Sequence, residues 1–285
     1  MAMELHVTLA VLGAAVCHAT WNALLKTGGD AVVRVAVVNG VAGLCALPIL
    51  VWLGLPAPAS WPWVATSAVV HLAYFATLTL AYRGGDLSLV YPVARGAAPL
   101  LVALGAWVVA GERLTLAQSA AVAMVCAGIL ALAFGGGRRA GAVRSVAWAL
   151  GTSLTIAAYS VADGIGGRLA GDVRAYVAML FVLNAPPYVI LALVLRRRAL
   201  ARALARDWRG GVVAGVLAFA GYGIAIWAMT RAPMTMVSAL RETSVLIAAL
   251  IGTRILGEGF GARRIGAALL VTLGVVVLQI LPADG

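Results

Sequence analysis

The sequence predicts an all-α integral membrane protein whose ten transmembrane helices form two inverted five-helix repeats. Composition is the first reason: hydrophobic residues make up 63% of the 285 residues, and charged residues only 11%. The mean hydropathy is +1.02. A soluble domain of this length could not cover so apolar a chain with polar surface. An internal repeat and a series of span-length apolar segments are the second and third reasons.

The repeat is defined by four landmarks that recur 146 residues later in the chain. Arg95, Gly111, Glu112 and Gly128 are followed by Arg241, Gly257, Glu258 and Gly274. In both copies the arginine stands near the start of an apolar run, 17 residues before the glutamate. Matched landmarks at one offset indicate a duplicated unit. We expect residues 1–136 to form the first five-helix repeat and residues 137–285 the second, within one membrane domain.

Ten apolar segments are long enough to cross about 30 Å of hydrocarbon. They occupy residues 5–26, 32–54, 61–82, 87–110, 115–134, 143–166, 174–195, 210–230, 234–256 and 263–281. The loops between them are short, and none could form a second domain. Ten-residue strands of alternating polarity are absent from the sequence, which excludes a membrane barrel.

Five crossings in each half place the second half in the membrane with the opposite orientation. Inverted repeats of this kind are typical of secondary transporters, whose binding site lies near the midplane between the halves. Duplication that serves stability alone is the alternative interpretation.

The basic residues predict the orientation. Fifteen lysines and arginines lie in or beside the loops after odd-numbered segments, six of them between residues 196 and 209, and four lie after even-numbered ones. Positive residues collect on the cytoplasmic side. We therefore expect both termini in the periplasm of a bacterial inner membrane, with the first segment retained as a span.

Several function classes are disfavoured by the sequence. The net charge of +11 comes largely from loop arginines, which fit an anionic membrane surface better than a nucleic acid. Cys17, Cys45 and Cys126 lie in apolar segments and read as small buried residues, so no disulfide framework or metal site is expected. No Walker sequence, metal-ligand cluster or nucleophile elbow occurs, and we expect no enzyme activity and no cofactor.

The two arginines inside apolar segments are the strongest site candidates, because a charge within a membrane span is costly. Arg95 shares a helix face with Ser88 and Tyr91, and prolines flank it. In the second copy, Thr235, Ser238 and Glu242 form the matching face beside Arg241. The functional interpretation is that these faces line a central cavity. The structural alternative is an internal ion-pair network that holds the helices together.

Polar and aromatic side chains in four other segments extend the set of candidate substrate-binding residues. They are His18, Trp21 and Asn22 in the first segment, His71 and Tyr74 in the third, Tyr159 in the sixth, and Tyr222 and Trp227 in the eighth. Each histidine has a structural alternative as a hydrogen-bonding group between helices. The tryptophans have one as interfacial anchors.

Proton coupling would require a titratable group at the site. His18, His71, Asp163 and Glu242 are the candidates, and the imidazoles, with an ordinary pKa near 6.5, are the closest to neutral pH. We expect His18→Ala or His71→Ala to flatten the pH dependence of transport while substrate binding survives. An unchanged pH profile would make these histidines structural.

Three features of the sequence belong together: the apolar repeats, the motif Gly111-Glu112-Arg113-Leu114 with its counterpart Gly257-Glu258, and the motif His18-Ala-Thr-Trp-Asn22 with Lys26. In these features the chain resembles the EamA-like ten-span proteins of the drug/metabolite transporter superfamily. The resemblance implies a ten-helix carrier of small metabolites, frequently an exporter of amino acids or related compounds, with its cavity between the repeats. The second motif departs from the family pattern, because Gly-Phe-Gly follows Glu258. Many relatives are thought to have cytoplasmic termini, which is the reverse of the orientation that the loop charges predict.

The leading hypothesis is a secondary transporter, an exporter, that moves a small anionic or zwitterionic metabolite by alternating access. Two mid-membrane arginines and few acids favour a carboxylate, phosphonate or phosphate group, which guanidinium binds bidentately. Efflux of cationic drugs is one alternative, and it would depend on Glu242 or Asp163. A membrane enzyme or lipid-handling scaffold is the other. The expected partners are the substrate, the bilayer and protons, and the protein is expected to be a monomer or homodimer.

Overall fold

The computed structural model describes residues 3–26, 30–84, 87–131, 142–206, 208–247 and 262–280. Within these ranges the regular elements are α-helices and one short 3₁₀ helix, Pro58–Ser60. The α-helices are α1 (Leu5–Lys26), α2 (Ala31–Leu53), α3 (Trp61–Gly84), α4 (Leu87–Gly96), α5 (Ala98–Ala110), α6 (Leu116–Ala131), α7 (Ala142–Leu169), α8 (Val173–Arg206), α9 (Trp208–Met229), α10 (Met234–Arg241) and α12 (Ala262–Ile280).

Seven helical segments of the described chain are long and apolar enough to cross a membrane. They confirm seven of the predicted spans, and α4 and α5 together supply one of them. The predicted segments 115–134 and 263–281 contain the shorter apolar helices α6 and α12. The predicted segment 234–256 is described only as far as residue 247. The chain is therefore a multi-pass membrane protein.

The outer surfaces of these helices carry large apolar side chains, as expected of a chain immersed in lipid. Val51 and Trp52 on α2, Trp107 on α5 and Val194 on α8 are all more than half exposed. Four charged groups inside the predicted spans are instead buried, namely Arg95, Asp163, Arg241 and Glu242. Charged groups in membrane spans usually face the interior of the bundle for the same energetic reason.

Two of the predicted spans are broken near the candidate arginines. The fourth span is divided at Ala97, between α4 and α5. Pro92 and Pro99 stand on either side of this break, and each lacks the N–H that a continuous helix would use. The Ser153 hydroxyl of α7 donates to the Ala94 carbonyl at 2.9 Å. A side chain of a neighbouring helix thus helps to satisfy the interrupted backbone, as broken membrane helices require.

The ninth predicted span is broken at the corresponding place. Helix α10 ends at Arg241, and Glu242 adopts a turn before a further helical segment over residues 243–247. The backbone N–H of Glu242 bonds to the Ala239 carbonyl three residues earlier. Both arginines therefore lie in the last turn of a short helix.

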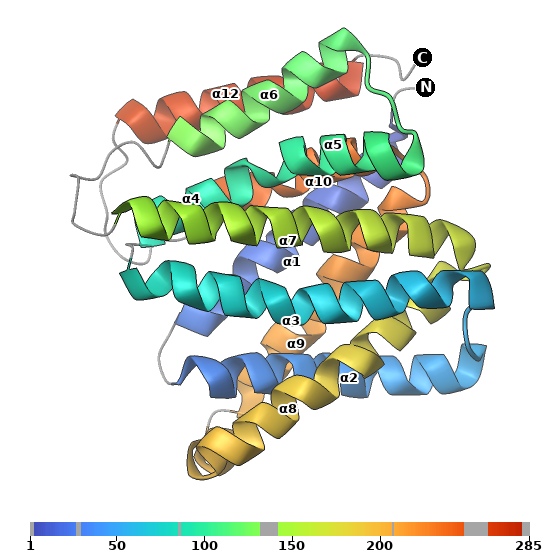
Figure 1. Ribbon diagram of the computed structural model, residues 1–285, viewed down its shortest axis with the longest axis vertical. Helices are drawn as coiled ribbons and strands as arrows, with labels where there is room; N and C mark the ends of the chain where they lie inside the picture. The colour runs from blue at the N-terminus through green and yellow to red at the C-terminus, as the bar shows by residue number, and fades with distance from the viewer. Residues whose placement is uncertain are drawn as a thin grey trace.

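The helices pack in pairs that join the first half of the sequence to the second half (Figure 1). Helix α2 packs on α8, α3 on α7, α1 on α9, and α6 on α12. Figure 1 shows α6 and α12 side by side along one edge of the bundle, while α4, α5 and α10 lie deeper, next to α7. The broken helices are thus surrounded by continuous ones.

Small residues allow the pair α6 and α12 to approach closely. A methyl group added at Gly128 would lie 2.8 Å from the Val271 side chain, and one added at Gly274 would lie 2.8 Å from the Val125 side chain. Both distances are far below van der Waals contact. Glycine at a helix crossing is a common device in membrane proteins.

Candidate functional site

An ion pair between the two halves of the sequence lies at the centre of the candidate site. The Nε atom of Arg95, at the end of α4, is 2.8 Å from Oε2 of Glu242, which follows α10. The two side chains are 5% and 2% exposed. The internal ion pair that was the structural alternative for Arg95 is therefore present. The Arg95 Nη2 atom is also buried and has no hydrogen-bond acceptor among the described residues.

The ends of the broken helices provide a favourable place for both guanidinium groups. The last carbonyl groups of a helix have no intrahelical donor and carry partial negative charge, so they stabilise a nearby cation. Arg95 and Arg241 occupy the last turns of α4 and α10. The sequence places these charges in the membrane interior, and the helix breaks reduce the cost of keeping them there.

Arg241 differs from Arg95 because its charge has no direct counterion among the side chains that the structure describes. The residue is 7% exposed, and its guanidinium carbon lies 5.1 Å from the centre of the Tyr222 ring. Among the described residues it makes no ion pair or hydrogen bond. Glu242 and Asp163 are near enough to interact with its charge, but each contacts other partners.

Four aromatic residues of three helices surround Arg241 on one side. His71 of α3 stacks on Tyr159 of α7 with ring centres 4.1 Å apart, and the Tyr222 ring of α9 meets His71 edge-on at 5.7 Å. Tyr74 meets Tyr159 edge-on at 5.9 Å. The structure thus brings four predicted site residues into one cluster beside Arg241.

One ring nitrogen of His71 has a hydrogen-bond partner within its own helix. Its Nδ1 atom lies 2.8 Å from the Ser67 carbonyl oxygen, which makes Nδ1–H the donor in that contact. In addition, the Tyr188 hydroxyl of α8 donates to the His71 carbonyl at 3.0 Å. The histidine side chain is therefore fixed by hydrogen bonding at one edge and by ring contacts on its faces.

Asp163 is fully buried on α7 and is held by hydroxyl groups from neighbouring helices. The Tyr176 hydroxyl of α8 donates to its Oδ1 atom at 2.9 Å, and the Tyr222 hydroxyl of α9 donates to Oδ2. Ser67 of α3 also hydrogen-bonds to this carboxyl group. Because Tyr222 touches both Asp163 and Arg241, it connects this carboxyl group to the aromatic cluster.

The remaining predicted residues divide into those near the arginines and those apart from them. His18 of α1 lies close enough to interact with Arg95 and Arg241, and Trp21 meets its ring edge-on at 5.2 Å. The Asn22 amide is directed back to the His18 carbonyl at 2.8 Å.

Two further residues complete the inner face. Tyr91 lies near Arg95 and Glu242, and Ser238 is buried on α10. The Trp227 ring instead contacts His6 and the Arg231 guanidinium, near the end of α9. The side chain of Ser88, Gly257 and Glu258 lie outside the described residues.

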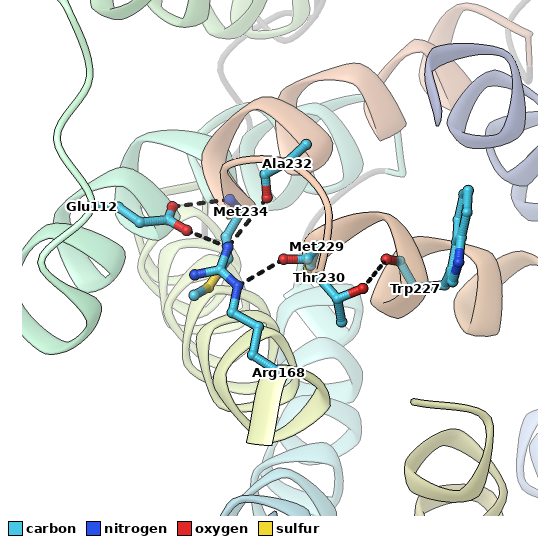
Figure 2. A network of polar contacts seen from close by, with 7 residues as sticks. All are labelled: Glu112, Arg168, Trp227, Met229, Thr230, Ala232 and Met234. Atoms are coloured by element: carbon cyan, nitrogen blue, oxygen red, sulfur yellow. Dashed lines mark hydrogen bonds and ion pairs between the residues drawn. The ribbon is translucent and has the colours of Figure 1, made fainter. Parts of the chain in front are cut away.

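A second polar network connects the two halves at one end of the bundle (Figure 2). The Nη2 atom of Arg168, near the end of α7, donates to Oε1 of Glu112 at 2.5 Å. The other carboxylate oxygen of Glu112 accepts a bond of 2.9 Å from the backbone N–H of Met234. Arg168 also donates through Nε to the Met229 carbonyl at 2.9 Å and through Nη2 to the Ala232 carbonyl at 3.2 Å.

The Gly111-Glu112 pair takes its structural role from this network. Gly111 has φ of +68° and ends α5 in the left-handed conformation that glycine adopts without strain. The turn directs Glu112 toward the start of α10. The repeat marked this pair as important, but the partner Arg168 carried no sequence signal, because it lies 56 residues away at an ordinary helix end.

The described residues contain no group of three or more His, Cys, Asp or Glu side chains that could hold a metal ion. Cys126 is buried, and Cys17 and Cys45 are partly buried, each with a free thiol. The chemistry of the site is therefore that of guanidinium, carboxylate, imidazole and phenol groups. These groups can bind a polar solute and exchange protons.

Buried charges at the ends of broken helices, enclosed by continuous apolar helices, are the main polar feature of this multi-pass membrane protein. Residues 143–280 match the EamA-like transporter family. This segment is therefore an EamA-like domain, and the family belongs to the drug/metabolite transporter superfamily. The family resemblance predicted from the sequence is confirmed, and members of the family are transporters rather than enzymes.

Comparison with solved structures supports the fold over the whole chain. A solved structure described only as a crystal structure of a protein is 19% identical, and the match covers 96% of each chain with a TM-score of 0.77. At that identity the likeness concerns the fold alone. No curated protein matches the sequence.

Proposed function

We propose that the protein is a secondary transporter that exports a small anionic or zwitterionic metabolite, an amino acid or related compound, by alternating access. The observation that carries this proposal is the Arg241 guanidinium, which is buried at a helix break without an ion-pair partner among the described residues. A buried charge that lacks a partner is costly unless a ligand compensates it.

The distribution of charges around Arg241 favours an anionic group on the substrate. Glu242 contacts Arg95, and the Asp163 carboxyl group accepts bonds from tyrosine hydroxyls. Arg241 thus remains available to bind a carboxylate, phosphonate or phosphate group. Guanidinium binds such groups through two parallel hydrogen bonds.

Alternating access requires two halves that can move relative to each other, and several observations support such a design. Gly128 packs against Val271, and Gly274 packs against Val125. Adding 146 to the numbers 125 and 128 gives 271 and 274, so the two contacts are equivalent under the repeat. The helix pairs α3–α7 and α1–α9 correspond in the same way. We infer two inverted repeats, residues 1–136 and 137–285, related by a pseudo-two-fold axis.

The proposed membrane orientation follows from the loop charges. Arg196, Arg206 and Arg209 fall near the α8–α9 connection, and Asp30 at the start of α2 contacts Arg196. We propose that this end faces the cytoplasm and that both termini face the periplasm of a bacterial inner membrane. A C-terminal alkaline phosphatase fusion should then be active in cells, whereas a fluorescent protein fused there should remain dark.

Counterflow in proteoliposomes tests the proposed function. Vesicles containing the protein and an unlabelled solute should accumulate the same labelled solute for at least one amino acid or organic acid of a broad panel. The panel should also contain lipophilic cations, because cation efflux is the alternative that Glu242 and Asp163 would serve. Saturable counterflow of cations alone would refute the anion proposal. An absence of counterflow across the whole panel would refute transport of small metabolites.

A further inference from the structure

The contacts of Glu112 join three elements that belong to different halves of the chain. Glu112 follows α5, Arg168 closes α7, and Met234 begins α10. One carboxylate binds both the Arg168 guanidinium and the Met234 N–H, as Figure 2 shows. The Glu112 and Arg168 side chains are 13% and 34% exposed. The network therefore lies at the edge of the bundle, partly open to its surroundings.

Arg168 extends this tie across the connection between α9 and α10. Its guanidinium binds the carbonyl groups of Met229 and Ala232, which precede Met234 in the chain. These carbonyls belong to the end of α9 and to the turn after it, where few helical donors remain. A single ion pair thus fixes the end of α5, the end of α7 and the loop between α9 and α10.

Helix α10 connects this tie directly to the candidate substrate site. It contains eight residues, which corresponds to about 12 Å of helix. Its first residue, Met234, is bound by Glu112, while its last residue is Arg241. The next residue, Glu242, contacts Arg95. Both ends of α10 are therefore attached to the first half of the chain.

The side of the membrane on which the tie lies is defined by the connectivity. The end of α5 is at the same end of the bundle as the start of α1 and the end of α12, as Figure 1 shows. Helix α10 leads from this end of the bundle to Arg241, and its start is joined here to the ends of α5 and α7. The tie holds these three segments together.

Resting on the proposed transport function, we propose that Glu112 and Arg168 form a gate between the two halves on the side of the termini. The gate is closed when the Glu112 carboxylate binds Arg168 and Met234. It opens when these bonds are released and α10 moves away from α5. Because α10 carries Arg241, opening of the gate and movement of the substrate site are parts of one motion.

Accessibility of a reporter cysteine tests the gate. Ser238 lies on α10 between the gate and Arg241 and is 3% exposed. Ser238→Cys is introduced into a variant whose three native cysteines are replaced by alanine. Reaction with a membrane-impermeant anionic methanethiosulfonate is measured from each face. Vesicle orientation is scored by protease cleavage of a C-terminal tag.

Two gate variants and one matched control are compared. Glu112→Gln and Arg168→Ala each remove the ion pair. Asp172→Asn removes an exposed ion pair with Arg174, two residues away within the same half. We expect both gate variants to react from the side of the termini about tenfold faster or more, the factor that corresponds to loss of one charge-assisted hydrogen bond. Reaction from the opposite face should become slower, and Asp172→Asn should behave as the parent.

The outcomes separate the gate from the transport proposal. Unchanged reactivity in both gate variants would refute the gate. An increase from both faces would also refute it, since general loosening would then account for the effect. A one-sided increase without counterflow of any solute would support the gate while refuting the transport function. Monodisperse elution of each variant verifies that the protein is folded.

Discussion

At the scale of single residues, the ion pair between Arg95 and Glu242 joins the last turn of α4 to the residue that follows α10. Both side chains are buried, so removing one of them leaves the other charge without a partner. We predict that Arg95→Ala or Glu242→Ala lowers the free energy of unfolding by about 3–5 kcal/mol. Denaturant unfolding in detergent micelles measures this difference.

The double variant provides the control for this prediction. Arg95→Met combined with Glu242→Leu removes both charges and keeps apolar volume, so it should be more stable than either single variant. If each single variant were as stable as the parent, the pair would not be buried and dehydrated as described.

A second residue, Asp30, connects the start of α2 to α8 through Arg196. Its Oδ1 atom accepts a bond from the Val32 N–H at 2.9 Å and caps α2, while Oδ2 accepts a bond from Arg196 at 2.7 Å. Partial burial opposes ionisation, but the hydrogen bonds from Arg196 and the helix backbone outweigh it and lower the pKa of Asp30 below its ordinary value of 3.8. The carboxylate therefore favours the folded state.

This shift predicts a specific dependence on pH. The stabilisation by Asp30 should be complete above the ordinary pKa and should be lost as the pH falls through the lower folded pKa. Thermal unfolding of the parent and of Asp30→Asn should differ at pH 6, and the difference should shrink below about pH 4. A difference that stays constant from pH 6 to pH 2 would show that the charge of Asp30 has no part in it.

At the scale of elements, the packing of α6 on α12 depends on two glycines. Leucine at position 128 or 274 would collide with a valine of the facing helix. We predict that Gly128→Leu and Gly274→Leu each destabilise the protein, by about 1–3 kcal/mol, and by similar amounts because their contacts correspond. Gly266→Leu on α12 is the control, since nothing lies within 4 Å of an added methyl group there. Equal loss in the control would assign the effect to leucine itself rather than to the helix contact.

The elements also show how far the sequence could predict this protein. The long spans were predicted from continuous apolar segments, because the thickness of the membrane sets the minimum length of such a segment. Pro92 and Pro99 indicated a loosened helix near Arg95, and the break at Ala97 is the result. The break after Arg241 has no proline beside it, and it was not predicted from the sequence.

Contacts between side chains of distant segments could not be predicted from the sequence. The partners of Asp163 and Glu112 come from other helices, and no spacing rule relates residues on separate helices. Arg95 and Glu242 were each candidate site residues, yet their pairing depends on how α4 meets α10. The sequence could identify costly polar groups, but only the packing decides which of them satisfy one another and which, like Arg241, remain available.

At the scale of the whole molecule, two attachments connect the halves through α10. Glu112 binds its first residue and Arg95 binds the residue after its last one. A carrier that alternates between two states needs contacts that can be exchanged rather than a continuous apolar interface. Substrate binding at Arg241 would act on the same helix that the gate holds, which couples occupancy of the site to the position of α10.

Ligand-induced thermal stabilisation tests whether Arg241 binds an anionic group of the substrate. A ligand that binds the folded state stabilises it by about 2.7 kcal/mol at a concentration of 100 times its Kd. The parent protein, Arg241→Gln and Arg209→Gln should be screened against amino acids, organic acids, phosphonates and phosphate esters. Arg209 is the matched control, because its guanidinium lies 5.6 Å from the ring centre of Trp208, outside the site.

We expect at least one anionic or zwitterionic compound to raise the unfolding temperature of the parent and of Arg209→Gln, and to leave that of Arg241→Gln unchanged. Stabilisation of Arg241→Gln by the same compound to the same extent would show that Arg241 does not bind the anionic group.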